Sequence, residues 1–447
     1  MFLSIRKSQI GELALDPERS TYNKIFWRTV PLFFLCYVVS YLDRVNIGFA
    51  KLQMLGDLRL SDNVYALGAS ILFWGYVLFE MPSNLILHKV GARRWIARIM
   101  VSWGIVSILI MFIEPLGRLF HTGSATMFYV LRFLLGVCEA GFFPGVVFYL
   151  NRWFPSNRQS RVMGGFMFAL PLSLCLGGPV SGWVLQNMHD VLGYRGWQWM
   201  LLIEGLPAVI LGCVVWMTLT ETVEQANWLS DDEKDLVKRN LSSENVRKPH
   251  RFGAAMQSPV IWILCAILLT MNTSFYGLSF WLPSIISAAG LKGAFDIGLL
   301  AALPYFVAGI TMLANVMHSN HTGERRLHAA VPAACAGIAL ILSAAFASRL
   351  GLSVLFITVA ASGIIGITPL FWIFSGRALS GSAAAAGLAM INSIGSLAGV
   401  TGAMITNIAK NLTGNIHSGT YVLGGCMLVC CALILLLPRA AVSTGPA

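Results

Sequence analysis

Long apolar stretches alternate with short polar segments along almost the whole 447-residue chain. Twelve stretches reach the roughly 20 residues that a helix needs to cross the hydrocarbon core of a bilayer. Strands of a membrane barrel would instead alternate apolar and polar residues. The pattern therefore predicts an all-α membrane protein with twelve transmembrane helices. They are expected at residues 27–50, 64–87, 95–114, 124–150, 161–187, 198–220, 258–284, 297–317, 328–348, 351–375, 382–409 and 420–438.

The longest polar stretch carries charges of both signs and separates the sixth span from the seventh. We expect an N-terminal six-helix bundle over 1–220, a cytoplasmic linker over 221–257 and a C-terminal six-helix bundle over 258–447. A repeat supports this division, because HKVGARR follows the second span and NHTGERR follows the eighth. Two pseudo-symmetric halves built from parallel repeats are a known transporter plan.

Lysine and arginine gather on one predicted side of the membrane. That side holds the N-terminal segment, the linker and the basic turns Arg93–Arg94 and Arg325–Arg326. Positive loops stay in the cytoplasm, so both termini are expected there. The two basic turns are candidate gating loops. The polar start of the chain does not resemble a signal peptide, and the first span is expected to direct insertion.

Composition removes several classes of protein. Charged residues make up 11% of the chain and apolar residues 56%, whereas soluble domains carry about 25% charged residues. The net charge of +11 comes without a basic-aromatic patch, so it indicates positive loops and no nucleic-acid partner. The nine cysteines lie in apolar runs without metal spacing, which argues against a metal site. No pattern of catalytic groups indicates an enzyme.

Charged residues inside the first and fourth spans need an explanation, because each costs about 2.5–3.5 kcal/mol at the middle of a membrane helix. In the first span, Arg44 shares one stripe with Tyr41 and Gly48, and Asp43 points to the side. Arginine offers a planar fork that fits a carboxylate. We expect Arg44 to be an anion receptor in a central cavity. A structural pair near the helix end is the alternative.

The fourth span holds Arg132 and Glu139 on one face, seven residues apart. Burial favours the neutral acid and a nearby arginine favours the charged acid, so a moving arginine could load and unload a proton. A static ion pair is the alternative. Among the other embedded acids, Glu80 is expected to have a role in a gate or in helix packing. Glu204 is expected to have a structural role. Trp281 is expected to be an anchor at the membrane interface.

Several segments resemble the major facilitator superfamily over almost the whole chain, and within it the anion:cation symporter family. They include SYLDRVNIGFAKLQM, YVLFEMPSNLILHKVGARRWIARIM, LRFLLGVCEAGFFPG, GWQWMLLIEGLPAVILG and YGLSFWLPSII. The resemblance implies proton-coupled carriage of carboxylates such as sugar acids, tartrate, phthalate and hydroxyphenylacetate. It also assigns roles to the embedded residues. Asp43 and Glu139 match proton-linked acids, Arg44 a carboxylate-binding arginine, and Arg132 the arginine that exchanges partners with the acid of the fourth span; Tyr41, Tyr76, Asn392 and Trp372 match pocket residues.

The basic turns depart from the superfamily motif, which places an Asp before the basic residues. His88 stands there in the first half and Asn320 in the second. The family often lacks the first Asp, so the departure bears on the second half, where the cytoplasmic charge lock is expected to lack its usual acid.

These observations predict a secondary active transporter that imports a small organic anion with protons by alternating access. Protons are the coupling ion and no cofactor is expected. The protein is expected to be a monomer among the lipids of a bacterial inner membrane. A proton-independent anion exchanger, a cation or drug:proton antiporter on the same fold, and a membrane sensor that binds without transport remain as alternatives.

Overall fold

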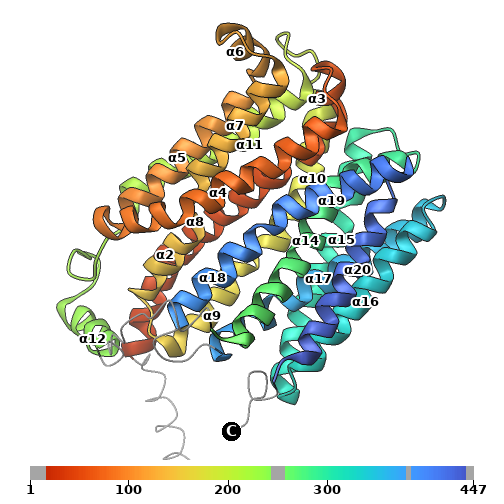
Figure 1. Ribbon diagram of the computed structural model, residues 1–447. Helices are drawn as coiled ribbons and strands as arrows, with labels where there is room; N and C mark the ends of the chain where they lie inside the picture. The colour runs from red at the N-terminus through yellow and green to blue at the C-terminus, as the bar shows by residue number, and fades with distance from the viewer. Residues whose placement is uncertain (1–16, 243–256, 379–383, 439–447) are drawn as a thin grey trace, which may run out of the picture.

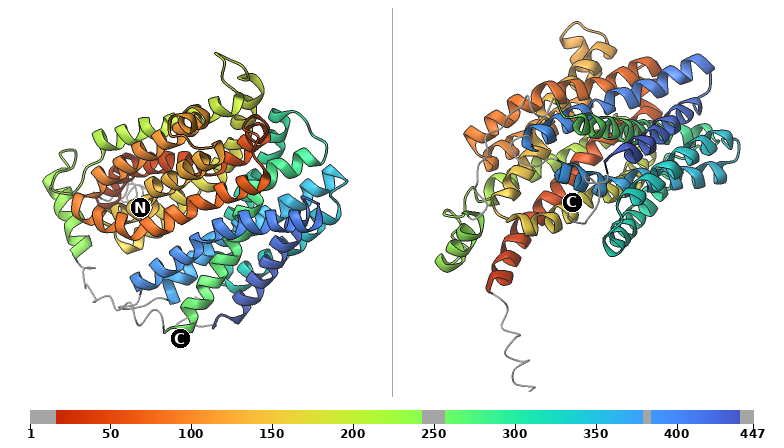
Figure 2. Two further views of the ribbon diagram at one scale, coloured as in Figure 1. Left: turned by 45° about the horizontal axis from the view of Figure 1, so that its top comes forward. Right: turned by 60° about the horizontal axis from the view of Figure 1, so that its bottom comes forward.

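The computed structural model describes residues 17–242, 257–378 and 384–438, and these residues form helices joined by short loops. Two groups of helices lie side by side, and α12 (Asp231–Ser242) lies beside the first group at one end of the molecule (Figures 1 and 2). The first group is α2 (Pro17–Val45), α3 (Ile47–Asp57), α4 (Asp62–Val90), α5 (Ala92–Ile110), α6 (Ile113–Leu119), α7 (Ser124–Glu139), α8 (Phe142–Asn151), α9 (Ser156–Met167), α10 (Ala169–Asn187) and α11 (Gly196–Thr218). The second is α14 (Pro259–Ala288), α15 (Ala294–Thr322), α16 (Arg326–Ala345), α17 (Leu350–Ala378), α18 (Ala384–Ser396), α19 (Ala398–Thr413) and α20 (Ser418–Leu436).

The all-helical membrane fold is confirmed. In the described residues, ten helical segments are long and apolar enough to cross a bilayer, and an eleventh is counted when the bent pair α5–α6 is taken as one span. This bend of 87° lies inside the predicted third span, 95–114, close to its end. The predicted span 382–409 is divided between α18 and α19, each too short to count alone, and its first two residues lie outside the described part of the chain.

Both described ends of the chain lie at the same end of the molecule as α12 (Figure 1). The basic segments predicted to be cytoplasmic also adjoin this end, since α4 finishes and α5 begins there. We refer to this end as the inner end. The opposite end, where α3 and α6 lie, is the outer end.

Four of the long helices are interrupted midway. The interruptions lie at Asn46 between α2 and α3, at Ala140 and Gly141 between α7 and α8, at Phe168 between α9 and α10, and at Leu397 between α18 and α19. Gly141 has φ +89°, which glycine adopts without strain. The dihedral angles of Asn46, Phe168 and Leu397 stay helical, whereas the chain is unwound at Ala140 and Gly141. Unwound helices accompany binding sites in transporters. The break at Ala140 directly follows the embedded charge Glu139, and the break at Asn46 lies two residues after Arg44.

Near the outer end, the two groups approach so closely that side chains cannot fit between them. A Cβ atom on Gly178 of α10 would collide with the backbone of Gly298 on α15, and one on Gly182 with the backbone of Ala294. Small residues permit such close helix packing in membranes. The contact closes the outer end of the interface between the two groups.

Candidate functional site

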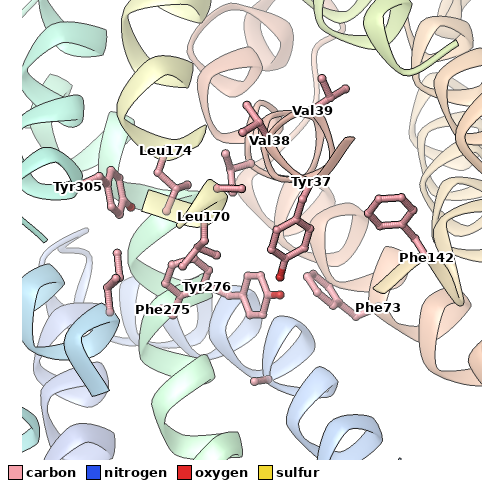
Figure 3. Packing of buried hydrophobic residues seen from close by; sticks show 14 of the residues in the cluster. Tyr37, Val38, Val39, Phe73, Phe142, Leu170, Leu174, Phe275, Tyr276 and Tyr305 are labelled. Carbon is pink, nitrogen blue, oxygen red and sulfur yellow. The ribbon is translucent and has the colours of Figure 1, made fainter. Parts of the chain in front are cut away.

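A cavity of about 100 Å³ lies between the two groups of helices. Aromatic side chains from both groups form much of its wall. In Figure 3, Tyr37 of α2, Phe73 of α4 and Tyr276 of α14 turn toward one another, and the rings of Phe73 and Tyr276 are 4.7 Å apart. The remaining lining residues include Ser40, Tyr41, Arg44, Tyr76, Phe142, Phe143, Met271, Asn272, Thr368, Trp372, Asn392 and Ser396.

Arg44 lies in the last turn of α2 and extends into this cavity. Its Nη2 donates to Glu139, and its Nη1 donates to the hydroxyl of Tyr276 at 3.3 Å. The guanidinium lies 5.4 Å from the ring centres of both Tyr41 and Tyr76, within the range of cation–π attraction. Its side chain is 12% exposed, so the charge is held in a largely dry site that one acid and three tyrosines surround.

Glu139 is the last residue of α7, and the break at Ala140 follows it directly. Ser40 Oγ also donates to its carboxylate, at 3.1 Å. A neighbouring helix stabilises the break, because Ser83 Oγ of α4 donates to the carbonyl oxygen of Ala140 at 2.6 Å. In the fourth span, α7 therefore ends at Glu139, the residue that pairs with Arg44 of the first span.

Asp43 points away from the cavity, as its position beside Arg44 predicts. Its carboxylate accepts hydrogen bonds from Ser107 of α5 and, at 3.3 Å, from Asn46. Arg132 is 1% exposed and its Nε donates to the carbonyl oxygen of Gly68 at 3.2 Å. In this conformation the partner of Glu139 is Arg44, and Arg132 lies on the Asp43 side of the N-terminal group.

The four predicted pocket residues, Tyr41, Tyr76, Trp372 and Asn392, all lie on the cavity wall. Asn392 belongs to the second group, yet its Nδ2 donates to Glu80 of the first group at 2.5 Å. Ser393 Oγ also reaches Glu80, at 3.4 Å. This contact joins α4 to α18, and the gate or packing role of Glu80 stays a prediction.

Sequence reasoning missed Tyr37 and Ser40 as wall residues. Their signal was present, because Tyr37, Tyr41 and Arg44 follow one another at helical spacing and share one face of α2. Tyr37 stacks on Phe166, with ring centres 4.4 Å apart, and meets Tyr41 edge-on at 5.0 Å. The face of the first span that carries Tyr41 and Arg44 therefore continues toward the N-terminus of α2 and includes Tyr37.

The first basic turn obtains its missing acid from a distant segment. Glu221, which follows α11, accepts from the backbone N–H groups of Ala92 and Arg93, at 2.8 Å each. Arg93 Nε donates to the carbonyl oxygen of Trp216 at 2.6 Å, whereas Arg94 is exposed. A carboxylate at a helix N-terminus is favourable, so Glu221 ties the start of α5 to the end of α11.

The second basic turn is capped locally. Glu324 accepts from the N–H groups of Leu327 and His328, at 2.8 and 3.2 Å, and from the imidazole of His328. Burial raises the pKa of Glu324, but these hydrogen bonds outweigh it and leave the pKa below its usual value. Arg325 and Arg326 follow it at the start of α16. The acid of this turn thus caps its own helix.

A second charged cluster joins the two groups at the outer end. Asp62 of α4 pairs with Lys51 of α3, at 2.8 Å, and with Lys410 of α19. Lys51 Nζ lies 3.6 Å from the ring centre of Trp281 in α14. Trp281 is 0% exposed, so its interpretation as an anchor at the membrane interface is wrong: it packs across the two groups beneath a lysine. We call Lys51, Asp62, Lys410 and Trp281 the outer gate.

Substitution of Asp62 by asparagine is expected to open this gate. The change keeps the shape but leaves Lys51 and Lys410 facing one another without a counter-charge. We expect the population that is open at the outer end to rise about fivefold, equivalent to about 1 kcal/mol. Double electron–electron resonance between spin labels at positions 59 and 415, in a variant without the native cysteines, would measure the population that is open at the outer end. An exposed acid, Asp190, gives the matched control Asp190→Asn; equal distance distributions in the two variants would refute the gate.

Within the described residues, no group of three histidine, cysteine or acidic side chains could hold a metal ion. What the site offers is a cation facing a small chamber that both groups of helices line. A model of the Major Facilitator Superfamily matches residues 33–403. The chain belongs to the Major Facilitator Superfamily. It is therefore a multi-pass membrane transporter, and the prediction that it is not an enzyme is confirmed by its family.

Curated relatives span nearly the whole chain. An Agrobacterium vitis protein provisionally named a tartrate transporter is 44% identical over 96% of this chain and 97% of its own length. The inner membrane transport protein RhmT of Escherichia coli K12 is 36% identical over 92% and 93%. The quinolone resistance transporter of Acinetobacter baumannii is 34% identical over 93% and 94%.

Solved structures support the same fold. The crystal structure of a D-xylose–proton symporter superposes with a TM-score of 0.72 over 93% of this chain and 98% of that chain, at 13% identity. At this identity the likeness establishes the fold alone.

Proposed function

We propose that this superfamily member imports a small organic anion together with protons by alternating access. The observation that carries the proposal is the placement of Arg44, a buried cation on the wall of the cavity between the two halves, with Glu139 as its counter-ion. A planar guanidinium can bind a carboxylate through two parallel hydrogen bonds. We expect the substrate carboxylate to take the place that the Glu139 carboxylate occupies beside Arg44.

This exchange of partners couples the anion to a proton. With Glu139 charged, a substrate carboxylate would bring two negative charges to one guanidinium in a dry site, which is unfavourable. A protonated Glu139 releases Arg44 and leaves the bound substrate with one counter-ion. Each anion that binds therefore requires one proton on Glu139.

The wall of the cavity limits the substrate to a small anion. Its aromatic rings suit the face of a sugar acid or an aromatic acid, and the tartrate transporter of Agrobacterium vitis supports a short hydroxy acid. On the same grounds we place the protein in the anion:cation symporter family. The relative RhmT supports a bacterial inner membrane.

We further propose that residues 1–220 and 258–447 rock as two bodies around the cavity, joined by 221–257. The closely packed glycines of α10 and α15 and the outer gate hold the outer end shut in this conformation. Opening the outer end would separate Lys410 from Asp62, because these residues belong to different bodies. A single chain carries every residue in this scheme, so a monomer suffices.

A second function, export of a cationic drug in exchange for protons, is favoured by one finding: the relative from Acinetobacter baumannii is named for quinolone resistance. Glu80 and Glu139 could bind such a cation. Arg44 opposes this function, because it is a cation on the cavity wall and already pairs with the carboxylate of Glu139. A third possibility, anion exchange without protons, needs Arg44 and not Glu139.

Transport into proteoliposomes separates these functions. With the interior alkaline, we expect radiolabelled tartrate to accumulate at least tenfold above its external concentration, and a protonophore to abolish this. An exchanger would show uptake only with tartrate or another carboxylate inside, at a rate that the pH gradient leaves unchanged. A drug antiporter would accumulate norfloxacin under the reverse gradient, with the interior acidic. Sugar acids and aromatic acids are tested in parallel.

A further inference from the structure

A polar network lies inside the N-terminal half, apart from the cavity. Glu204 of α11 is 4% exposed, and its Oε1 accepts a hydrogen bond from Ser181 of α10 at 2.6 Å. Asn46, at the break between α2 and α3, interacts through its side chain with both Glu204 and Asp43. Ser107 of α5 donates to Oδ1 of Asp43, the same carboxylate oxygen that accepts from Asn46. The network therefore links two buried acids, Glu204 and Asp43, through one amide.

Glu204 is suited to carry a proton. Its Oε2 is buried and has no hydrogen-bond partner in the described part of the chain. In the part of the chain that the structure describes, the groups that interact with it are Ser181 of α10, Asp43 of α2 and Asn46 between α2 and α3, and none of these is a cation. Arg132 of α7 interacts electrostatically with Asp43. A charged carboxylate in this place would have neutral donors but no cation to compensate it, and such a charge is costly to bury.

The depth of Glu204 places it between the outer surface and Asp43. Trp197 Nε1, near the start of α11, donates to Asp57 at the end of α3 at 2.9 Å, which sets the outer ends of these helices at one level. Glu204 lies seven residues inward from Trp197, about 10 Å at 1.5 Å per residue. Asp43 lies fourteen residues inward from Asp57, about 20 Å. A proton from outside would meet Glu204 first.

We propose that Glu204 is the outer station of a proton path that reaches Asp43 through the wall of the N-terminal half. In the transfer step, the O–H bond of the Glu204 carboxyl breaks and an O–H bond forms on the Asp43 carboxylate. Glu204 then takes a new proton from the outer side. Asn46 is a positioning residue that holds the two carboxyl groups toward one another. The inference rests on the proposed proton-coupled function.

This path is separate from the route of the substrate. Neither Glu204 nor Asp43 is among the residues that line the cavity, whereas Arg44 lines it and pairs with Glu139. When one substrate molecule is exchanged for another, the carrier stays protonated throughout, so no proton has to pass from Glu204 to Asp43. Net uptake requires a fresh proton in every cycle. The two modes of transport should therefore respond differently when the path is cut.

Glu204→Gln tests the proposal, because glutamine has the shape of the protonated acid but carries no exchangeable acidic proton. In proteoliposomes, we expect pH-driven uptake of tartrate, or of whichever carboxylate the wild type accumulates, to fall at least tenfold. Exchange of the same compound should stay within twofold of the wild type. The exposed acid Glu114, on the outer α6, gives the matched control Glu114→Gln, which should leave both modes unchanged.

The outcomes separate this proposal from the proposed function. If the wild type shows pH-driven uptake and Glu204→Gln retains it, the role of Glu204 is wrong and the symport stands. If no tested carboxylate is driven by a pH gradient in the wild type, the symport itself fails. Equal loss of both modes in a folded Glu204→Gln protein would indicate a structural role and overturn the proposal. Should this variant fail to fold, Asn46→Ala is judged by the same split between driven uptake and exchange.

Discussion

Replacement of Arg44 by alanine is expected to abolish binding of the organic anion. The substitution removes the cation of the cavity and leaves Glu139 without its ion-pair partner. Truncating one member of a buried, hydrogen-bonded charge pair across an interface costs about 2–5 kcal/mol. We therefore expect the affinity for the transported carboxylate to fall by at least about 100-fold and net uptake to disappear. Isothermal titration calorimetry on purified protein would measure the binding.

Two further variants make this test specific. Arg44→Lys keeps the charge but loses the fork, so we expect an affinity between those of the wild type and Arg44→Ala. Arg118→Ala removes an arginine that is 80% exposed at the outer end and should bind normally. Tight binding by Arg44→Ala would show that the carboxylate is held elsewhere, and the proposed role of Arg44 would be wrong.

The fold could be predicted from the sequence because its signals are local. A run of apolar residues specifies a membrane helix by itself, and the cost of a charge within such a run marks residues such as Arg44 and Glu139 as exceptional. Prediction was weaker where a helix bends or stops. The 87° turn after α5 and the break at Leu397 leave no clear trace in hydropathy.

The pairing of the embedded charges was harder to predict, because it depends on the rotation of each helix against its neighbours. Arg132 and Glu139 share a face of one helix, yet Glu139 pairs with Arg44, 95 residues away. Spacing along α7 fixes which residues share a face but not which other helix that face meets. The resemblance to known symporters indicated that Arg44 binds a carboxylate, and the structure shows that Glu139 is its partner in this conformation.

Contacts between distant segments could not be predicted from one sequence. Glu221 takes the place of the acid that is absent at His88, although 133 positions separate them. Asp62 and Lys410 meet across 348 positions. A lone acid in a loop gives no indication of such a partner, and a tryptophan near a predicted helix end is usually an interface anchor. Trp281 departs from that rule because Lys51 of the other half packs on its ring.

Glu139→Gln is expected to separate the anion from the proton. Glutamine imitates the protonated acid, so it no longer neutralises Arg44, and the guanidinium becomes permanently available to a substrate carboxylate. We expect exchange to continue and pH-driven accumulation to fall to the equilibrium level, a loss of at least tenfold. The mechanism also fixes a pH dependence. Binding to the wild type needs a protonated Glu139, so its affinity should fall as the pH rises, whereas the affinity of Glu139→Gln should stay constant.

Binding measured at several pH values distinguishes this residue from the other acids. Glu204→Gln leaves the Arg44–Glu139 pair intact, so its binding should keep the pH dependence of the wild type even though its driven uptake is lost. Calorimetric titrations of both variants at pH values from 5 to 9 make the comparison with one protein preparation each. If the affinity of Glu139→Gln falls with rising pH as steeply as that of the wild type, another group controls access to Arg44. If the affinity of Glu139→Gln does not change with pH and exchange is retained, the coupling proton lies on Glu139, because the substitution removes only the acidic hydrogen of this residue.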